Sequence, residues 1–375
     1  MDQLILLKDC EALGIHGNVL KWIKSYLEQR KFRVEIGKGT SAEAEMKTGI
    51  TQGTKLAPVM FSIYTAELYY MLSNMGFSCH FYADDSQIFI NVEDQDQVQR
   101  DFSEMMTAVA TWMSSRKLKL NANKTECILF DSNSRNVSIN PINNINMGTT
   151  TLTFSDSVRN LGVFFEKRLN MEKQIQNAKS KAIGNLINIS HISKYIDRNS
   201  RIKLVHGLVL SNIDYCNAMY INLPNYQLRE LQTVINSAAR VIAGLPRFSR
   251  ERITPICMNL HFLPIKARII FKICLIVYKV LKYGQPSYLA DFLQYRRPAR
   301  ALRNTDEDEL LEPVIARNAY SNRSFMYSAP RLYNGLPREV RGAESVTVFK
   351  TKLKTFLYRQ AYNTENMCIE PEFTT

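Results

Sequence analysis

The sequence predicts an α+β fold in its first part and a mostly α-helical fold after it. Its 375 residues are 45% hydrophobic, so the chain is long and apolar enough to bury a core. Between about residues 18 and 130, alternating apolar runs take turns with runs of helical spacing, whereas helical spacing dominates beyond residue 170. Hairpins that alternate with helices indicate antiparallel strands covered by helices, rather than a doubly wound parallel sheet.

The first elements follow from local patterns. Leu20, Ile23 and Leu27 recur with helical spacing after Asn18, a candidate N-cap. Residues 32–46 alternate apolar and polar side chains around two glycines, which predicts a β-hairpin. A glycine-bearing loop over residues 49–57 leads to a proline that favours the start of a helix, with apolar residues through Leu72.

Two strand-like runs, residues 78–82 and 86–90, meet at Asp84 and Asp85, which predicts a hairpin with its acidic residues at the tip. A helical stripe over residues 98–113 follows. We then expect short strands at Cys127–Phe130 and Asn160–Phe165, with a loop or an irregular hairpin between residues 131 and 151.

The remaining chain has helical periodicity. From Asn170 to about Ala243 the pattern is almost wholly helical, and Pro224 with Asn225 predicts a break between two long helices. Residues 264–283 and 348–361 read as further basic amphipathic helices.

Charge is unevenly distributed along the chain. Residues 1–130 carry 14 Lys+Arg and 16 Asp+Glu, a net charge of −2, whereas residues 131–375 carry 34 and 19, a net charge of +15. The excess favours a surface that binds polyanions such as nucleic-acid backbones. Ordinary solvated helix faces would explain the same excess, so charge alone leaves both interpretations open.

Other classes are disfavoured. The seven cysteines are scattered without a C-x-x-C pair, which argues against a zinc knuckle and predicts no disulfide partner. No run approaches the length of a membrane span, and the first residues have no signal-peptide pattern. We therefore expect an intracellular protein, nuclear or cytoplasmic, with no membrane partner.

The pair Asp84-Asp85 is the strongest candidate for chemistry. Two adjacent carboxylates repel each other unless a cation or hydrogen-bond donors neutralise them, and hard divalent ions prefer such oxygen ligands. Two aspartates in a turn are nevertheless common as plain turn residues. The apolar strands on both sides, Tyr82 just before the pair and the G-x-x-Q-G loop upstream favour the functional interpretation.

These motifs resemble a known family. Phe81-Tyr82-Ala83-Asp84-Asp85 is similar to the catalytic motif of reverse transcriptases, and residues 49–58, Gly-Ile-Thr-Gln-Gly-Thr-Lys-Leu-Ala-Pro, are similar to their preceding substrate loop. Residues 118–126 and 160–163 resemble the corresponding segments in the reverse transcriptases of non-LTR, or LINE-type, retrotransposons. The resemblance continues through residues 211–217 and 325–337, and so covers almost the whole chain.

The resemblance implies two-metal nucleotidyl transfer, with Mg²⁺ or Mn²⁺ as the cofactor and with an RNA template, a DNA primer and deoxynucleotides as partners. Asp84 would bind metal with Asp85 as a second acid. The residues implied to bind template and substrate are Gln52, Gly53, Tyr82 and Lys124. Leu161 and Gly162 would lie in the hairpin that grips the primer. An exposed lysine without a role is an equal alternative for Lys124.

The resemblance also implies the organisation of the chain. Residues 1–168 would be a partial polymerase palm, residues 169–245 a helical thumb-like domain, and residues 246–375 a basic, mostly helical C-terminal region. Thr51 and Ala57 stand where the family usually has proline and glycine. The family's fingers and the strand with its other metal-binding aspartate would precede Met1, and Asp2, Asp9 and Glu11 lie on the wrong element to replace that aspartate. We therefore expect this chain alone to be inactive.

Two functions remain open at this point. The first is an RNA-directed DNA polymerase that is incomplete in this chain. The second is a non-catalytic nucleic-acid-binding protein, a relic or a domesticated fragment whose basic helices are the functional part. The genomic sequence upstream of Met1 would separate them, because an in-frame catalytic strand restores the enzyme and stop codons do not.

Overall fold

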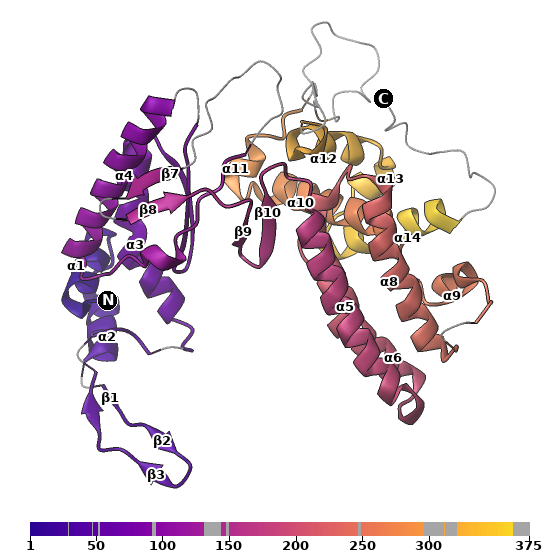
Figure 1. Ribbon diagram of the computed structural model, residues 1–375, viewed down its shortest axis with the longest axis horizontal. Coiled ribbons are helices and arrows are strands. Elements are labelled where there is room, and N and C mark those ends of the chain that lie inside the picture. Colours follow the sequence, from indigo (N-terminus) through magenta and orange to yellow (C-terminus); the bar gives the residue numbers. More distant parts are fainter. Residues whose placement is uncertain are drawn as a thin grey trace, which may run out of the picture. The chain divides into compact units, whose positions relative to one another are not determined.

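A computed structural model describes residues 1–28, 30–46, 48–51, 53–91, 95–130, 144–147, 150–246, 249–295, 311 and 321–362 (Figure 1). The chain forms two compact units. The first comprises Met1–Leu129 with Asn133–Leu161, and the second comprises Phe130–Ser132 with Gly162–Thr375.

The helices of the first unit begin where the sequence places starting signals. Asp2 caps α1 (Gln3–Ala12), because its carboxylate accepts hydrogen bonds from the backbone N–H groups of Leu4 and Ile5 at 3.0 and 3.2 Å. Helix α2 (Gly17–Leu27) starts just after His16 rather than at Asn18. Pro58 lies in the first turn of α3 (Ala57–Asn74), as predicted. Helix α4 (Gln95–Ser115) and the 3₁₀ turn η1 (Ala122–Lys124) complete the set.

The strands of the first unit form two-stranded antiparallel sheets in the part of the chain described. The predicted hairpin over residues 32–46 is confirmed, with β1 (Lys31–Phe32) paired to β4 (Ala44–Glu45) and β2 (Glu35–Ile36) paired to β3 (Gly39–Thr40). The predicted acidic hairpin is also confirmed as β5 (Ser78–Tyr82) and β6 (Asp85–Phe89). Strand β7 (Asn144–Met147) pairs with β8 (Thr150–Thr153), whereas residues 131–143 and 148–149 lie outside the described residues.

Two strand predictions are wrong. Cys127–Phe130 forms an isolated bridge between Cys127 and Phe154, and no strand within the described residues continues the ladder. The predicted strand Asn160–Phe165 is divided into β9 (Ser157–Asn160) and β10 (Val163–Glu166). Leu161 and Gly162 between them have φ of 45° and 84°, left-handed values that end an extended run, and their apolar surroundings hid this turn.

Two small cores hold the first unit together. One lies between α3, α4, β5 and the β7–β8 hairpin, and its buried members are Leu68, Leu72, Cys79, Val98, Phe102, Met105, Val109, Trp112, Ile145 and Leu152. The other lies between α1, α2 and the start of α3, and its buried members are Leu6, Cys10, Ile23, Leu27, Met60 and Tyr64. Helix α3 contributes to both cores and therefore links them.

The second unit is helical, but its first half differs from the prediction. Of the two long helices expected on either side of Pro224, the first is a wrong prediction, because the chain before Pro224 forms several shorter segments. These are α5 (Glu172–Ile192), the 3₁₀ turn η2 (Ser193–Tyr195), α6 (Arg198–Leu204), the π-helical η3 (Val205–Leu210), α7 (Ser211–Asp214) and the 3₁₀ turn η4 (Asn217–Tyr220). Asp197 caps α6, and Cys216 with φ of 53° ends α7. The second expected helix is confirmed as α8 (Asn225–Ala243).

The later helices follow the sequence closely. The two predicted basic helices are confirmed as α10 (Ile265–Tyr283) and α14 (Val346–Tyr362). Shorter elements surround them, namely α9 (Ile253–Asn259), α11 (Ser287–Ala290), η5 (Ser321–Arg323), α12 (Phe325–Asn334) and α13 (Arg338–Arg341).

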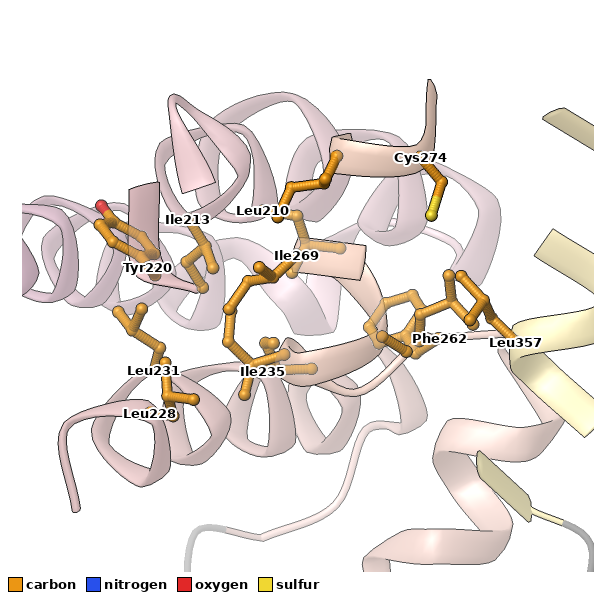
Figure 2. Close-up of a cluster of buried hydrophobic side chains, with 14 of the residues drawn as sticks. Leu210, Ile213, Tyr220, Leu228, Leu231, Ile235, Phe262, Ile269, Cys274 and Leu357 are labelled. Atoms are coloured by element: carbon orange, nitrogen blue, oxygen red, sulfur yellow. The ribbon is translucent and has the colours of Figure 1, made fainter. Parts of the chain in front are cut away.

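One hydrophobic core fills the second unit. Figure 2 shows side chains from distant parts of the sequence meeting there, among them Leu210, Ile213, Leu231, Ile235, Ile269 and Leu357. Helices from both sides of residue 245 therefore contribute to the same core. The division at that residue into a thumb-like domain and a C-terminal region assigns different functions to the two segments, and it stays a prediction. Among the described helices, none combines the length and the apolar character that crossing a membrane requires.

Candidate active site

The acidic hairpin places its two carboxylates at an exposed tip. Tyr82 and Asp85 are the last cross-strand pair of β5 and β6, so Ala83 and Asp84 form a two-residue turn between the strands. Ala83 has φ of 52°, which the first position of a type I′ or II′ hairpin turn requires. Tyr82, Asp84 and Asp85 are all exposed to solvent.

The base of this hairpin is anchored in the first unit. Cys79 is buried in the core with Leu72, and the edge of the Phe81 ring meets Tyr69 of α3 at 6.1 Å between centroids. On the other strand, Gln87 Nε2 donates a hydrogen bond of 2.9 Å to Asn160 Oδ1 at the end of β9. A solvated acidic tip on a packed base is an arrangement that can present carboxylates to a ligand.

The donor set at this tip fits a hard divalent ion in kind but not in number. Carboxylate oxygens are suitable ligands for Mg²⁺. Within the described residues, however, no group of three or more His, Cys, Asp or Glu side chains is placed to hold a metal ion. Asp84 and Asp85 by themselves would therefore offer a divalent ion an incomplete set of ligands.

The other early acids serve the fold. Asp2 caps α1, and its Oδ2 atom accepts a hydrogen bond from Lys117 Nζ at 2.5 Å, which together with the backbone N–H of Ile5 lowers the pKa of this carboxyl. Asp9 accepts two hydrogen bonds from Arg116 Nη1, at 2.6 and 2.7 Å. These contacts give both acids a structural role, and whether either could replace a catalytic aspartate stays a prediction.

The predicted substrate loop is tied to α2. Arg30 donates to Thr51 Oγ1 and stacks over the Tyr26 ring, with 4.0 Å from the guanidinium carbon to the ring centroid. Tyr26 in turn donates from its hydroxyl to Thr54 Oγ1 at 3.2 Å. Both contacts flank Gly53, while Gln52 lies outside the described residues. The loop is therefore held on both sides of the predicted substrate residues.

Gly53 has a conformational reason to be glycine. Its φ is +83°, and a Cβ added there would meet no atom within 4 Å. The open space leaves room for an approaching ligand, but the positive φ by itself explains the residue.

The remaining predicted site residues lie on other elements of the chain. Lys124 ends η1, its side chain is exposed, and no ion pair joins it to any described acid. Leu161 and Gly162 form the turn between β9 and β10, and a Cβ on Gly162 would meet the Tyr215 ring at 3.7 Å. Of the predicted residues, the structure thus brings together Tyr82, Asp84 and Asp85.

Sequence reasoning missed the polar network that joins α1, α3 and α4. Arg116 binds Asp9 as described and also donates to Glu67 Oε2. Glu67 further accepts a hydrogen bond from Trp112 Nε1 at 2.9 Å, and these two donors lower the pKa of its carboxyl. The partners are 49 and 107 residues apart in sequence from Arg116, so no local pattern pointed to them.

The later resembling motifs have structural contacts. Asp214 of residues 211–217 forms an ion pair with Arg268 at 2.7 Å. Asn334 of residues 325–337 binds both the N–H and the C=O of Leu311, at 2.9 and 2.8 Å. These residues brace the second unit, which accounts for them without a catalytic role.

Comparison with known proteins decides the family. Residues 3–165 match the model of the family described as reverse transcriptase (RNA-dependent DNA polymerase). Residues 3–165 belong to the reverse transcriptase family. The matched segment contains both the exposed Asp84-Asp85 tip and the substrate loop. The family resemblance predicted from the motifs is therefore confirmed.

Individual relatives agree on a non-LTR retrotransposon reverse transcriptase. The chain is 29% identical over 152 residues to a probable RNA-directed DNA polymerase from transposon BS of Drosophila melanogaster, covering 39% of this chain and 16% of the relative. It is 23% identical over 221 residues to a Pol polyprotein from the type-1 retrotransposable element R1 of Bradysia coprophila, covering 58% and 21%. It is 22% identical over 242 residues to the RNA-directed DNA polymerase from mobile element jockey of Drosophila funebris, covering 61% and 25%.

The chain spans about a quarter or less of the length of these relatives. Reverse transcriptases generally use divalent metal ions, and the described residues do not complete a site for one. The family implies a nucleic-acid template and nucleotide substrates.

Proposed function

We propose that this chain is the C-terminal portion of the RNA-directed DNA polymerase of a non-LTR retrotransposon. The observation that carries the proposal is the β5–β6 hairpin, which presents Asp84 and Asp85 at an exposed tip inside the segment that matches the reverse transcriptase family. The substrates would be an RNA template, a DNA primer and deoxynucleotides.

The role of the tip would be to hold divalent metal. Bound Mg²⁺ or Mn²⁺ would supply activation of the primer 3′-hydroxyl and stabilisation of the leaving pyrophosphate. Asp84 and Asp85 would hold that metal, and Tyr82 beside them would contact the nucleic acid or the nucleotide. Gln52 and Gly53 would position template and nucleotide, while Arg30 and Tyr26 hold the flanking threonines of their loop.

The isolated chain would not polymerise. Two metals bridged at an active site need more carboxylates than the adjacent pair at one hairpin tip, and the described residues add no third ligand. A strand that carries a further aspartate, supplied from outside these 375 residues, would complete the cage. The predicted primer-grip residues Leu161 and Gly162 and the predicted phosphate contact Lys124 would then act with it.

Primer extension tests the proposal. The purified chain is expected to incorporate no deoxynucleotide on an RNA template with Mg²⁺ or Mn²⁺. A fusion that adds the fingers and the first catalytic strand of a related intact element is expected to extend the primer, and Asp84→Ala in that fusion should abolish extension. Extension by the chain alone that Asp84→Ala abolishes would refute the inactivity. A folded fusion that binds template and primer yet never extends would refute the assignment of Asp84 and Asp85.

A second candidate function is favoured by the charge of the chain. Residues 131–375 carry a net charge of +15, calculated as 34 minus 19, which suits a non-catalytic protein that binds nucleic acid by its phosphates. The fusion experiment separates this candidate from the polymerase, because a binding fragment with a relic aspartate pair gains no activity.

A further inference from the structure

Helix α14 combines a buried apolar face with a long polar face that has no acidic residue. Phe349, Leu353 and Leu357 recur every four residues and are buried in the core of the second unit. Figure 2 shows Leu357 directed into that core. The exposed side chains include Lys350, Lys352, Lys354 and Arg359, and no Asp or Glu occurs between Val346 and Tyr362.

Contacts of the buried face of α14 determine which of its side chains point to solvent. The Phe349 ring stacks on the Tyr278 ring of α10 at 4.1 Å between centroids, with 13° between the ring planes. At the other end of the helix, the Tyr358 hydroxyl donates to the backbone oxygen of Met258 at 3.0 Å, and the Tyr362 hydroxyl donates to that of Phe262 at 2.7 Å. With both ends held, α14 cannot rotate, so its cations stay on the surface.

Among the residues that the structure describes, the surface cations of α14 form no ion pair with an acidic side chain. Lys352 Nζ donates to the backbone oxygen of Glu339 at 3.0 Å. For Lys350, Lys354 and Arg359, no described carboxylate lies within ion-pair distance. In the first unit, by contrast, the exposed Lys24 and Lys31 face Glu28 and Glu43 at 3.8 and 3.5 Å. The described acidic side chains therefore leave the positive charge of Lys350, Lys354 and Arg359 without an ion-pair partner.

The packing partner of α14 adds to this positive charge. Helix α10 contains Lys266, Arg268, Lys272, Lys279 and Lys282 and likewise no acidic residue. Only Arg268 among these cations has a described acidic partner, Asp214. Burial lowers the pKa of the His206 imidazole, and the nearby charges of Arg268 and Lys354 lower it further. Lys354 and Arg268 thus act on the same imidazole, while the charge of Asp214 opposes them.

Hydroxyl groups lie among the cations. Thr347, Thr351 and Thr355 are exposed on α14, and residues three or four apart are neighbours on one helix face. Lys350 and Lys354 consequently form one stripe with Thr347 and Thr351. Lysine and threonine are among the side chains that contact phosphate oxygens without reading the base sequence. The Thr351 hydroxyl already donates to the backbone oxygen of Thr347 at 3.1 Å, so the charged donors of the stripe are Lys350 and Lys354.

We propose that the Lys350–Lys354 stripe of α14 is a contact site for the sugar-phosphate backbone of a nucleic-acid duplex. The inference rests on the proposed function in naming this ligand, because a polymerase of this family handles an RNA–DNA duplex. It adds a site outside the matched residues 3–165, in a part of the chain whose role the motifs did not reveal.

The dimensions of the stripe limit the contact. Lys350 and Lys354 are about 6 Å apart along the helix axis at about 1.5 Å per residue. One duplex strand carries about one charge per 3.4 Å of axis, so the stripe spans about two phosphates. Each neutralised phosphate contributes about −0.9 to the slope of log affinity against log salt concentration, so the two lysines account for about −1.8.

A salt titration with a matched control tests the site. The full-length chain, its Lys350→Gln/Lys354→Gln variant and its Lys24→Gln/Lys31→Gln variant are each titrated with a fluorescent RNA–DNA duplex of about 20 base pairs, from about 50 to 300 mM salt. Both variants lose two exposed lysines. The α14 variant is expected to flatten the slope by about 1.8 and to bind about tenfold more weakly near 150 mM salt.

The control variant is expected to change the slope by less than half as much, because Glu28 and Glu43 already neutralise its lysines. Lys350→Arg/Lys354→Arg, which keeps the charge, should bind like the unmodified chain. Two duplexes of unrelated sequence should give the same result. Equal slopes for the α14 variant and the unmodified chain, or equal losses in the α14 and control variants, would overturn the proposal.

Lysine acetylation of the unmodified chain provides a readout that needs no variant. The duplex should protect Lys350 and Lys354 from acetylation and leave Lys24 and Lys31 reactive. Reactivity of Lys350 and Lys354 that the bound duplex does not change would overturn the site, as would an absence of binding near 50 mM salt. The primer-extension fusion decides the proposed function separately, since its result depends on Asp84.

Discussion

Tyr82 and Asp85 face each other as the last cross-strand pair of the β5–β6 hairpin. This pairing leaves only Ala83 and Asp84 for the turn, so the two carboxylates remain at the tip next to each other. The turn needs a left-handed residue, and Ala83 takes that conformation with φ of 52°. A residue with a Cβ is strained there, by about 1–2 kcal/mol.

Replacement of Ala83 by glycine should relieve this strain. We expect Ala83→Gly to stabilise the first unit by about 0.5–1 kcal/mol, because the relief of strain exceeds the entropy that glycine loses on folding. As a control, Ala110→Gly at an exposed position of α4 should destabilise by about 1 kcal/mol. Urea unfolding measures both changes, and a loss of stability in Ala83→Gly would contradict the assigned turn.

Magnesium should stabilise the chain only slightly. An incomplete cage binds Mg²⁺ weakly, and stabilisation by a ligand grows as the logarithm of its concentration over its dissociation constant. Thermal melts with and without about 10 mM Mg²⁺ should differ little. Asp84→Asn should melt at the same temperature or slightly higher, since it removes repulsion from Asp85. A large Mg²⁺-dependent rise that Asp84→Asn abolishes would reveal a complete site.

The Arg116–Asp9 pair should contribute strongly to the stability of the first unit. Both side chains are largely buried, with 12% and 16% exposed, and loss of one partner leaves the other charge uncompensated. We expect Arg116→Met to cost about 2–4 kcal/mol in urea unfolding. Lys24→Met, which removes an exposed pair with Glu28, should cost less than about 0.5 kcal/mol. Similar costs for the two variants would contradict this structural role.

The titration of His206 should report the position of Lys354. Burial and the charges of Arg268 and Lys354 lower its pKa in the folded chain, while Asp214 opposes them. His206 is thus protonated more easily in the unfolded chain than in the folded one. Its contribution to the free energy of unfolding is present above the pKa that it has in the unfolded chain, and is lost as pH falls through the pKa that it has in the folded chain. In a proton NMR titration, Lys354→Gln should raise the pKa of His206, and Lys352→Gln should leave it unchanged. A His206 pKa unaffected by Lys354→Gln would place the two residues apart.

Local sequence patterns predicted the elements whose signals lie within a few residues. Pro58 predicted the start of α3, and alternation on both sides of Asp84 and Asp85 predicted the hairpin. Apolar periodicity predicted α10 and α14. The same motifs were sufficient to predict the reverse transcriptase family before any geometry was known. These signals succeed because each depends on backbone preferences and on a single buried face.

Only the tertiary structure decided where apparently continuous patterns break. The run from Asn160 to Phe165 looked like one strand, but Leu161 and Gly162 adopt left-handed backbone angles and divide it. The segment from Asn170 to Pro224 looked like one helix, but it is divided at several points, among them Asp197 and Cys216. In the helical segment, apolar periodicity continues through such turns, because Ile189, Val205 and Ile213 on different sides of the breaks face the same core.

Partners distant in sequence were also decided by the tertiary structure. The sequence indicated no partner for Asp9, and the fold pairs it with Arg116, 107 residues away. The basic residues of the second half of the chain could not be ranked by sequence alone. Packing selects among them, because α14 buries Phe349, Leu353 and Leu357 and thereby leaves Lys350 and Lys354 exposed on a helix that contains no acidic residue. Ion pairs and exposed charge patterns depend on which faces meet, and local backbone preferences carry no information about that.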